Sequence, residues 1–263
     1  MIKNAKKSIY KPSLSNMCIT LYNRLKTQPR LKIDLSYEFQ KTAYDDLSIY
    51  PKLKELREKA RKVGEGRKLY QKMLETYVPL EELPVGEKPK ILSVGCGISY
   101  EALVLSGHFG KKPGGADSSE VEFTGIDLDK ESIESAIKDN VTLDFSTYEY
   151  IPKPNYQFFC MDARLVADIT KEPFDVVVAS HPEVWHNYLV WQGIFDSAYS
   201  VHKPGGLIIS TTHLEEELDQ LEDLLKNRYK IMVKERNIYP HDVSTDMLNP
   251  VFTHKYVLVG VKE

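Results

Sequence analysis

The chain has 263 residues, of which 42% are hydrophobic and 28% charged, values typical of a folded globular protein and unlike a disordered or collagen-like chain. This length fits one catalytic domain with an appendage and excludes two complete catalytic domains. No apolar run is long enough to span a membrane and the amino terminus has no signal-type apolar block, so we expect a cytoplasmic protein without membrane association. The cysteines, Cys18, Cys96 and Cys160, lack any paired spacing and are expected to be reduced thiols.

The N-terminal third differs from the rest of the chain in charge and in pattern. Residues 1–89 hold 19 Lys and Arg against 11 Asp and Glu, although the whole chain has a net charge of −3. Apolar residues recur at three- and four-residue steps over 51–77, which predicts an amphipathic helix that the glycines around residue 65 can break, and helical patches precede it. We interpret the basic run in this helix as a solvated face. The predicted domains are a helical N-terminal cap or substrate region over residues 1–86 and a catalytic domain over 87–263.

After residue 86 short β-branched runs alternate with helical patterns, which indicates a doubly wound α/β sheet. Seven strands are predicted, at residues 90–94, 121–127, 156–160, 174–179, 207–212, 231–237 and 256–261. Helices are predicted at residues 100–109, 130–143, 185–201 and 215–226, with a short one after residue 162. No helix separates the last two strands, so the sheet is expected to be mostly parallel with its last strand antiparallel.

In such a sheet the ligand lies beyond the carboxyl ends of the strands. The first strand runs into Gly95-Cys96-Gly97-Ile98-Ser99, where the two glycines allow a tight turn and close approach of a ligand. Tyr100 stands where a dinucleotide fingerprint requires Gly or Ala, which argues against a dehydrogenase. Asp127 ends the second strand, where its carboxylate can accept both hydrogen bonds of a ribose diol.

The glycine loop, Asp127, and Asp162-Ala163 after the third strand together resemble the class I, Rossmann-like S-adenosylmethionine-dependent methyltransferase family over roughly residues 88–263. The resemblance implies S-adenosylmethionine as the cofactor, with Gly95 to Gly97 along its methionine part and Asp127 on its ribose. It further implies that Leu128 packs on the adenine and that Asp162 accepts the adenine amino group. The cofactor-binding residues so implied are Gly95, Cys96, Gly97, Ser99, Asp127, Leu128, Asp162, Ala163 and Ser180.

Two positions depart from the family pattern. Ser93 stands where the family usually has an acidic residue on strand one, and Ser99 where it often has a third glycine. These departures leave the mode of methionine binding open. The carboxylates also have a structural alternative, because Asp127 can cap the helix that begins near Lys130 and Asp162 can cap a short helix of its own.

Methyl transfer is an in-line displacement from a sulfonium, for which the protein aligns the nucleophile and, when needed, supplies a base. His181, Glu183 and His186 follow the fourth strand and are the candidate catalytic residues, with a structural histidine as the alternative. Their spacing matches no established helical metal-ligand set, so no metal is expected. The aromatic residues Trp185, Tyr188 and Trp191 are interpreted as core.

The sequence thus predicts a methyltransferase that acts on an O or N nucleophile of a small-molecule acceptor. Transfer of an aminopropyl or aminocarboxypropyl group on the same fold is one alternative. Another is a non-catalytic nucleotide-pocket module that binds RNA or a protein partner through the basic N-terminal helix. Nucleic-acid methylation is less favoured, because no Asn-Pro-Pro-Tyr type motif follows the fourth strand, where Ser180-His181-Pro182-Glu183 stands instead. Nothing in the sequence indicates the oligomeric state.

Overall fold

The computed structural model describes residues 51–78, 80, 88–110, 120–141, 154–170, 172–242 and 252–263. The predicted N-terminal region is therefore seen only in part, and residues 1–50 and the predicted domain boundary near residue 86 lie outside the described residues. A compact unit runs from Lys59 to Glu263. No helix in the described part of the chain combines the length and the apolar character needed to cross a bilayer.

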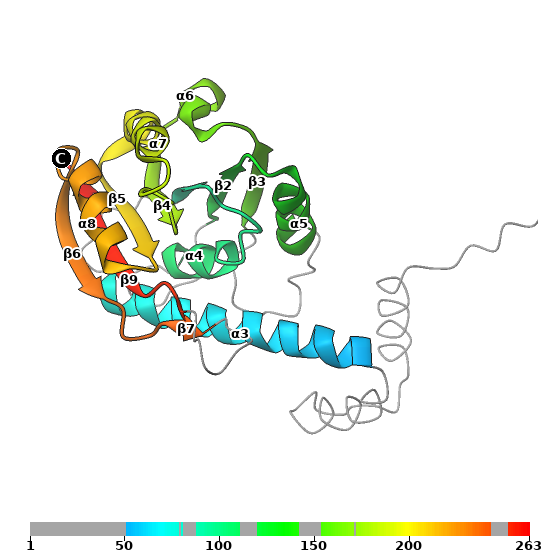
Figure 1. Ribbon diagram of the computed structural model, residues 1–263. Helices are drawn as coiled ribbons and strands as arrows, with labels where there is room; N and C mark the ends of the chain where they lie inside the picture. Colours follow the sequence, from blue (N-terminus) through cyan, green and yellow to red (C-terminus); the bar gives the residue numbers. More distant parts are fainter. Residues whose placement is uncertain are drawn as a thin grey trace, which may run out of the picture. The chain divides into compact units, whose positions relative to one another are not determined.

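The predicted seven-stranded sheet is confirmed, with strand order β3-β2-β1-β4-β5-β9-β6 (Figure 1). Its strands are β1 (Lys90–Val94), β2 (Glu122–Asp127), β3 (Asn155–Cys160), β4 (Phe174–Ser180), β5 (His202–Thr212), β6 (Tyr229–Arg236) and β9 (Tyr256–Lys262). Strands β1 to β5 are mutually parallel, whereas β9 runs antiparallel to both β5 and β6. The chain therefore reverses once in the order of strands, between β1 and β4, the place where doubly wound sheets bind ligands.

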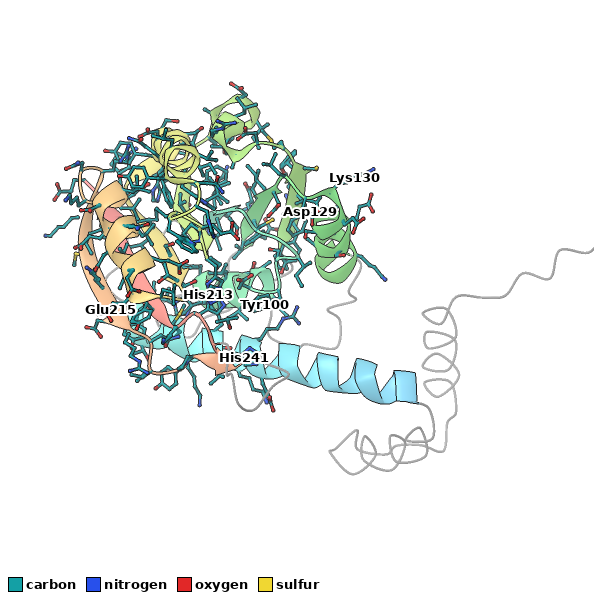
Figure 2. The ribbon with its side chains drawn as sticks, viewed as in Figure 1. Tyr100, Asp129, Lys130, His213, Glu215 and His241 are labelled. Carbon is teal, nitrogen blue, oxygen red and sulfur yellow. The ribbon has the colours of Figure 1, made fainter. Side chains whose placement is uncertain are left out.

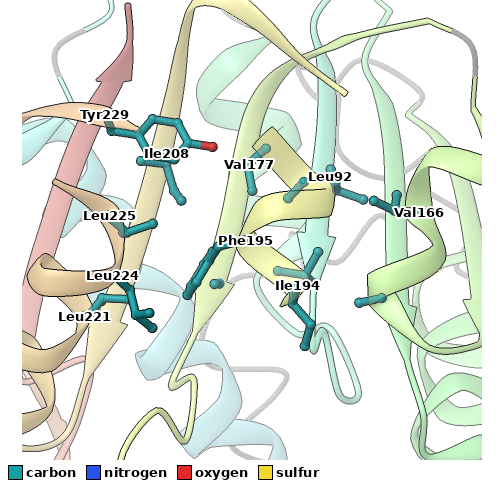
Figure 3. Packing of buried hydrophobic residues seen from close by; sticks show 14 of the residues in the cluster. Leu92, Val166, Val177, Ile194, Phe195, Ile208, Leu221, Leu224, Leu225 and Tyr229 are labelled. Atoms are coloured by element: carbon teal, nitrogen blue, oxygen red, sulfur yellow. The ribbon is translucent and has the colours of Figure 1, made fainter. Parts of the chain in front are cut away.

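The central strands are apolar along their length because helices cover both faces of the sheet. In β4, the residues from Phe174 to Ala179 are all buried. One face is covered by the 3-10 turn η4 (Ala163–Leu165), α6 (Val166–Ile169), α7 (Tyr188–Ser200) and α8 (Glu215–Leu225). Figure 3 shows Phe195 of α7 within this layer, with Leu224 and Leu225 of α8 on one side and Ile194 and Val166 on the other.

The opposite face is covered by α4 (Ala102–Phe109) and by the later turns of α3 (Pro51–Tyr77). Helix α3 is continuous through Gly64 and Gly66, where the sequence allowed a break. Gly66 is needed for packing, since a Cβ there would stand 2.8 Å from Nδ1 of His241. Helix α5 (Lys130–Val141) contacts β2 and β3.

Two element starts differ from the prediction by three residues or more, and one short hairpin was not predicted. Strand β5 begins at His202, so the turn-like residues 203–206 form an irregularity within the strand, where the pairing with β4 shifts register. Helix α7 begins at Tyr188 because residues 183–187 form turns instead. Within the predicted loop between the last two strands, β7 (His241–Asp242) pairs antiparallel with β8 (Phe252–Thr253).

Candidate functional site

The loop after β1 has the backbone conformation expected of a ligand cradle. Gly95 and Gly97 have φ values of 64° and 51°, in the left-handed region that favours glycine, and Ser99 also lies there with φ 53°. The amide of Cys96 donates to the carbonyl of Ile126 at 3.0 Å, which joins the loop to β2. A Cβ built on Gly97 would meet no protein atom within 4 Å. The loop therefore borders open space that a side chain at this position would enter.

Asp127 faces this loop and does not cap the following helix. Its Oδ2 accepts from the amide of Gly97 at 2.7 Å and its Oδ1 from the amide of Asp129 at 2.8 Å. Asp129 is the residue that caps α5, because it accepts from the amides of Glu131 and Ser132. The capping alternative for Asp127 is thus wrong. Next to it, Leu128 is 71% exposed, which offers an apolar surface beside the carboxylate.

Asp162 does cap a short helix, as the structural alternative predicted. Its Oδ1 accepts from the amide of Arg164 at 2.9 Å, and its Oδ2 forms an ion pair with the Arg164 guanidinium at 2.5 Å. This guanidinium also lowers the pKa of the Asp162 carboxyl. Ala163 beside it is buried. A cofactor role for Asp162 requires that it accept a further hydrogen bond while holding Arg164.

His181, directly after Ser180 at the end of β4, is the most unusual of the predicted catalytic residues. It has φ 56°, a strained conformation for a residue with a side chain. Neither ring nitrogen has a hydrogen-bond partner in the described structure, although both are buried. Its ring stacks on that of His213 with centroids 3.9 Å apart and planes at 12°. Burial and His213 lower the pKa of His181 to about 3, so its imidazole is neutral at pH 7.

The other two predicted catalytic residues are not gathered around His181. Glu183 and His186 are exposed, and the His186 ring lies 3.9 Å from the Trp185 ring. Trp185 is 57% and Tyr188 41% exposed, so their interpretation as core is wrong. Only Trp191 packs against the buried cluster under α7.

The structure adds buried residues at this edge that sequence reasoning missed. His254 is buried between its neighbours: Nδ1 lies 2.8 Å from Oγ1 of Thr211, Nε2 is hydrogen-bonded to the Tyr100 hydroxyl, and its ring centroid is 4.5 Å from that of His181. Glu101, which is 8% exposed, has Oε1 3.9 Å from His254 Nε2. Figure 2 shows Tyr100 and His213 at this edge of the sheet.

The order and direction of the strands could have located His213 and His254 at this edge of the sheet. His213 directly follows β5, and His254 precedes β9, which runs antiparallel to β5 and so starts at the edge where β5 ends. Among the described residues, no group of three His, Cys, Asp or Glu side chains is arranged to hold a metal ion.

The doubly wound sheet, its reversed last strand and the glycine loop facing Asp127 define a Rossmann-like methyltransferase fold. Residues 86–255 match the family model described as "Methyltransferase domain". The chain belongs to this family, the S-adenosylmethionine-dependent methyltransferases of class I. S-adenosylmethionine is its cofactor. The open space at Gly97 could hold its methionine part, and the Asp127 carboxylate and the exposed Leu128 could hold its adenosyl group.

Solved structures to which the chain is similar include methyltransferases of several organisms. A S-adenosylmethionine-dependent methyltransferase of Methanosarcina mazei has 16% identity and a TM-score of 0.47, with 70% of this chain and 97% of that chain covered. Magnesium protoporphyrin IX methyltransferase of Synechocystis has 13% identity, coverage of 76% and 80%, and a TM-score of 0.47. An N-methyltransferase of Bradyrhizobium japonicum has 12% identity, coverage of 76% and 97%, and a TM-score of 0.49. No curated protein matches the chain.

Proposed function

We propose that the chain transfers the methyl group of S-adenosylmethionine to an O or N nucleophile of a small-molecule acceptor, beside His181. The observation that carries this proposal is the buried imidazole of His181, whose two ring nitrogens lack partners in the described structure. Such groups cost free energy, as does a left-handed backbone at a residue with a side chain. The hydroxyl or amine of an acceptor supplies the missing hydrogen-bond partner.

The chemistry requires alignment more than strong acid or base catalysis. The cofactor supplies a methyl group on a positively charged sulfur. A neutral His181 accepts a hydrogen bond from the acceptor and so directs a lone pair of the nucleophile. Because its pKa is low, His181 is a weak base, and the proton released from the nucleophile passes to water.

The other residues of the proposed site lie at or just after the carboxyl ends of the strands. The cofactor lies along Gly95, Cys96, Gly97, Ser99, Asp127, Leu128, Asp162, Ala163 and Ser180. We assign residues 87–263 to the catalytic domain and residues 1–86 to a helical region that shapes the acceptor pocket. The contact between the rings of Tyr70 in α3 and His254, 4.7 Å apart, supports this role for α3.

A small-molecule acceptor is favoured over RNA by the Ser180-His181-Pro182-Glu183 segment, which lacks the Asn-Pro-Pro-Tyr type motif of base-methylating relatives. Aminopropyl or aminocarboxypropyl transfer stays an alternative, since only the attacked carbon differs.

The test is an acceptor screen with S-adenosylmethionine labelled in its methyl group, using pooled small amines, phenols and carboxylic acids, with total RNA in a parallel reaction. We expect label in a small molecule, and the mass of the product separates methyl from larger transferred groups. His181→Asn, which tolerates the left-handed backbone, should lower kcat by about 100-fold. Glu216→Gln, an exposed change on α8, serves as the control. Label found only in RNA, or full activity of His181→Asn, would contradict the proposal.

A further inference from the structure

Glu101 is a buried carboxyl group next to the glycine loop. It stands four residues after Gly97 and immediately before α4, and it is 8% exposed. Its side chain makes no hydrogen bond that caps α4. Instead it is hydrogen-bonded to Ser180 at the end of β4 and lies 3.9 Å from His254 Nε2. The carboxyl therefore lies where the loop after β1 meets the end of β4.

This carboxyl lacks a cationic partner. In the described part of the chain, Glu101 forms no ion pair with a lysine or an arginine. The positive charge of Arg67 in α3 acts to lower the pKa of Glu101. The Nε of Arg67, however, donates to the carbonyl of Tyr100 at 3.0 Å. Burial and neighbouring histidines lower the pKa of His254 and keep its ring neutral. An unpaired buried carboxylate is costly, so a ligand cation at this place would be strongly favoured.

The cofactor brings such a cation, because its methionine part ends in an α-ammonium group. Strand β1 offers no counter-charge, since the residue near its end is Ser93, a buried neutral hydroxyl. We propose that the carboxylate of Glu101 binds the α-ammonium group of S-adenosylmethionine. This inference rests on the cofactor and is independent of the acceptor.

The protonation of Glu101 follows from the groups around it. Burial raises its pKa to about 7, while hydrogen bonds from its own backbone amide and from Ser180, and the charge of Arg67, oppose the shift. The other titratable neighbours are neutral at pH 7, since burial raises the pKa of the Tyr70, Tyr100 and Cys96 side chains and lowers that of His254. Near pH 7 Glu101 is thus about half protonated in the free protein, and it must lose its proton to pair with an ammonium group. Binding of the cofactor at pH 7 should therefore release about half a proton per protein molecule.

Calorimetric titration with two ligands tests this pairing. The first is S-adenosylhomocysteine, which has the ammonium group, and the second is its deaminated analogue, which keeps the carboxylate and adenosine but has hydrogen in place of the amino group. Glu101→Gln should weaken the first ligand at least tenfold and the second less than twofold. Titration at pH 7 in two buffers of different ionisation enthalpy should show release of about half a proton with wild type and none with Glu101→Gln. Glu216→Gln should behave as wild type.

These outcomes test the pairing of Glu101 with the ammonium group, whatever the methyl acceptor is. Equal losses for both ligands, or unchanged proton release in Glu101→Gln, would overturn it. Failure of wild type to bind either ligand would overturn the cofactor site itself. If Glu101→Gln does not fold, wild type alone gives the test: its affinity for S-adenosylhomocysteine should fall about tenfold from pH 8 to pH 6 while that for the deaminated analogue stays constant. A parallel fall for both ligands would overturn the proposal.

Discussion

The backbone amide of Gly97 donates a 2.7 Å hydrogen bond to Oδ2 of Asp127, which ties the loop after β1 to the end of β2. The two residues are 30 apart in sequence: Gly97 lies in the loop after β1, and Asp127 ends the adjacent parallel strand β2. One carboxylate thus fixes the glycine loop and keeps lone pairs on both oxygens for a ligand.

Replacing Asp127 should abolish cofactor binding with a modest effect on folding. Asp127→Ala removes the acceptor that faces the loop, and we expect the affinity for S-adenosylhomocysteine to fall at least 100-fold by calorimetry. Asp129→Ala is the matched control two residues away, because it removes only the cap of α5. It should lower the free energy of unfolding slightly and leave the affinity near that of wild type. Similar affinities for the two variants would show that Asp127 is not a cofactor residue.

A methyl group on Gly97 should block the ligand while disturbing the protein little. A Cβ there meets no protein atom within 4 Å, so Gly97→Ala should cost only the strain of φ 51°, about 1 to 2 kcal/mol. The affinity for S-adenosylhomocysteine should nevertheless fall at least tenfold. Gly107→Ala, in α4 and equally free of contacts, should be neutral or stabilising and should bind normally. Unchanged affinity in Gly97→Ala would mean that the ligand does not approach this face of the loop.

The fold could be predicted from the sequence because its strands and helices have clear local patterns. β4 is continuously apolar, and the acidic amphipathic segment of α8 has its expected bounds within one residue. The start of β5 was missed because Pro204 and Gly205 resemble a turn, although His202 already pairs with Phe174. Gly205 accommodates this irregularity with φ 75°.

The site was only partly predictable. The sequence pattern shows where strands end, but it does not show which distant side chains meet. The positions of Asp127 and His181 follow from counting strands. The roles of Glu101 and His254 depend on side chains that meet over a sequence separation of 153 residues, which periodicity does not record. Asp129 and Asp127 compete for one capping role, and only the geometry shows which residue takes it.

The buried carboxylate of Asp175 should make Lys203 important for stability. Lys203 Nζ lies 2.7 Å from Asp175 Oδ1, and the amide of Lys90 donates to Oδ2 at 2.8 Å. Lys203→Met leaves the buried charge without its cation and should lower the free energy of unfolding in urea by about 2 to 3 kcal/mol. Adding Asp175→Asn should recover much of this loss. Lys226→Met breaks an exposed pair with Asp223 and should lower the free energy of unfolding far less than Lys203→Met does. Equal effects of the two lysine changes would contradict the burial argument.

Acid should destabilise the fold before the surface carboxylates titrate. Burial lowers the pKa of His181 to about 3 and of His202 to about 4, and it also lowers that of His254. A histidine in the unfolded chain has a pKa of about 6.5. As the pH falls below this value, the unfolded chain binds protons that the folded chain does not bind, and this favours unfolding. His181 and His202 should each reduce the free energy of unfolding by about 2 kcal/mol at pH 5, and His254 should reduce it further.

Glu101 opposes this trend, because its raised pKa lets the folded state take a proton first as the pH falls from about 7 toward 4.5. Three histidines outweigh one carboxyl, so urea unfolding should show a net loss of stability between pH 7 and pH 5. In Glu101→Gln the loss should be steeper, since the opposing proton uptake is gone, whereas Glu216→Gln should follow wild type. A stability that is constant or rises over this range would mean that the histidines accept protons in the folded state, which requires water or a counter-charge in the cluster at the end of β4.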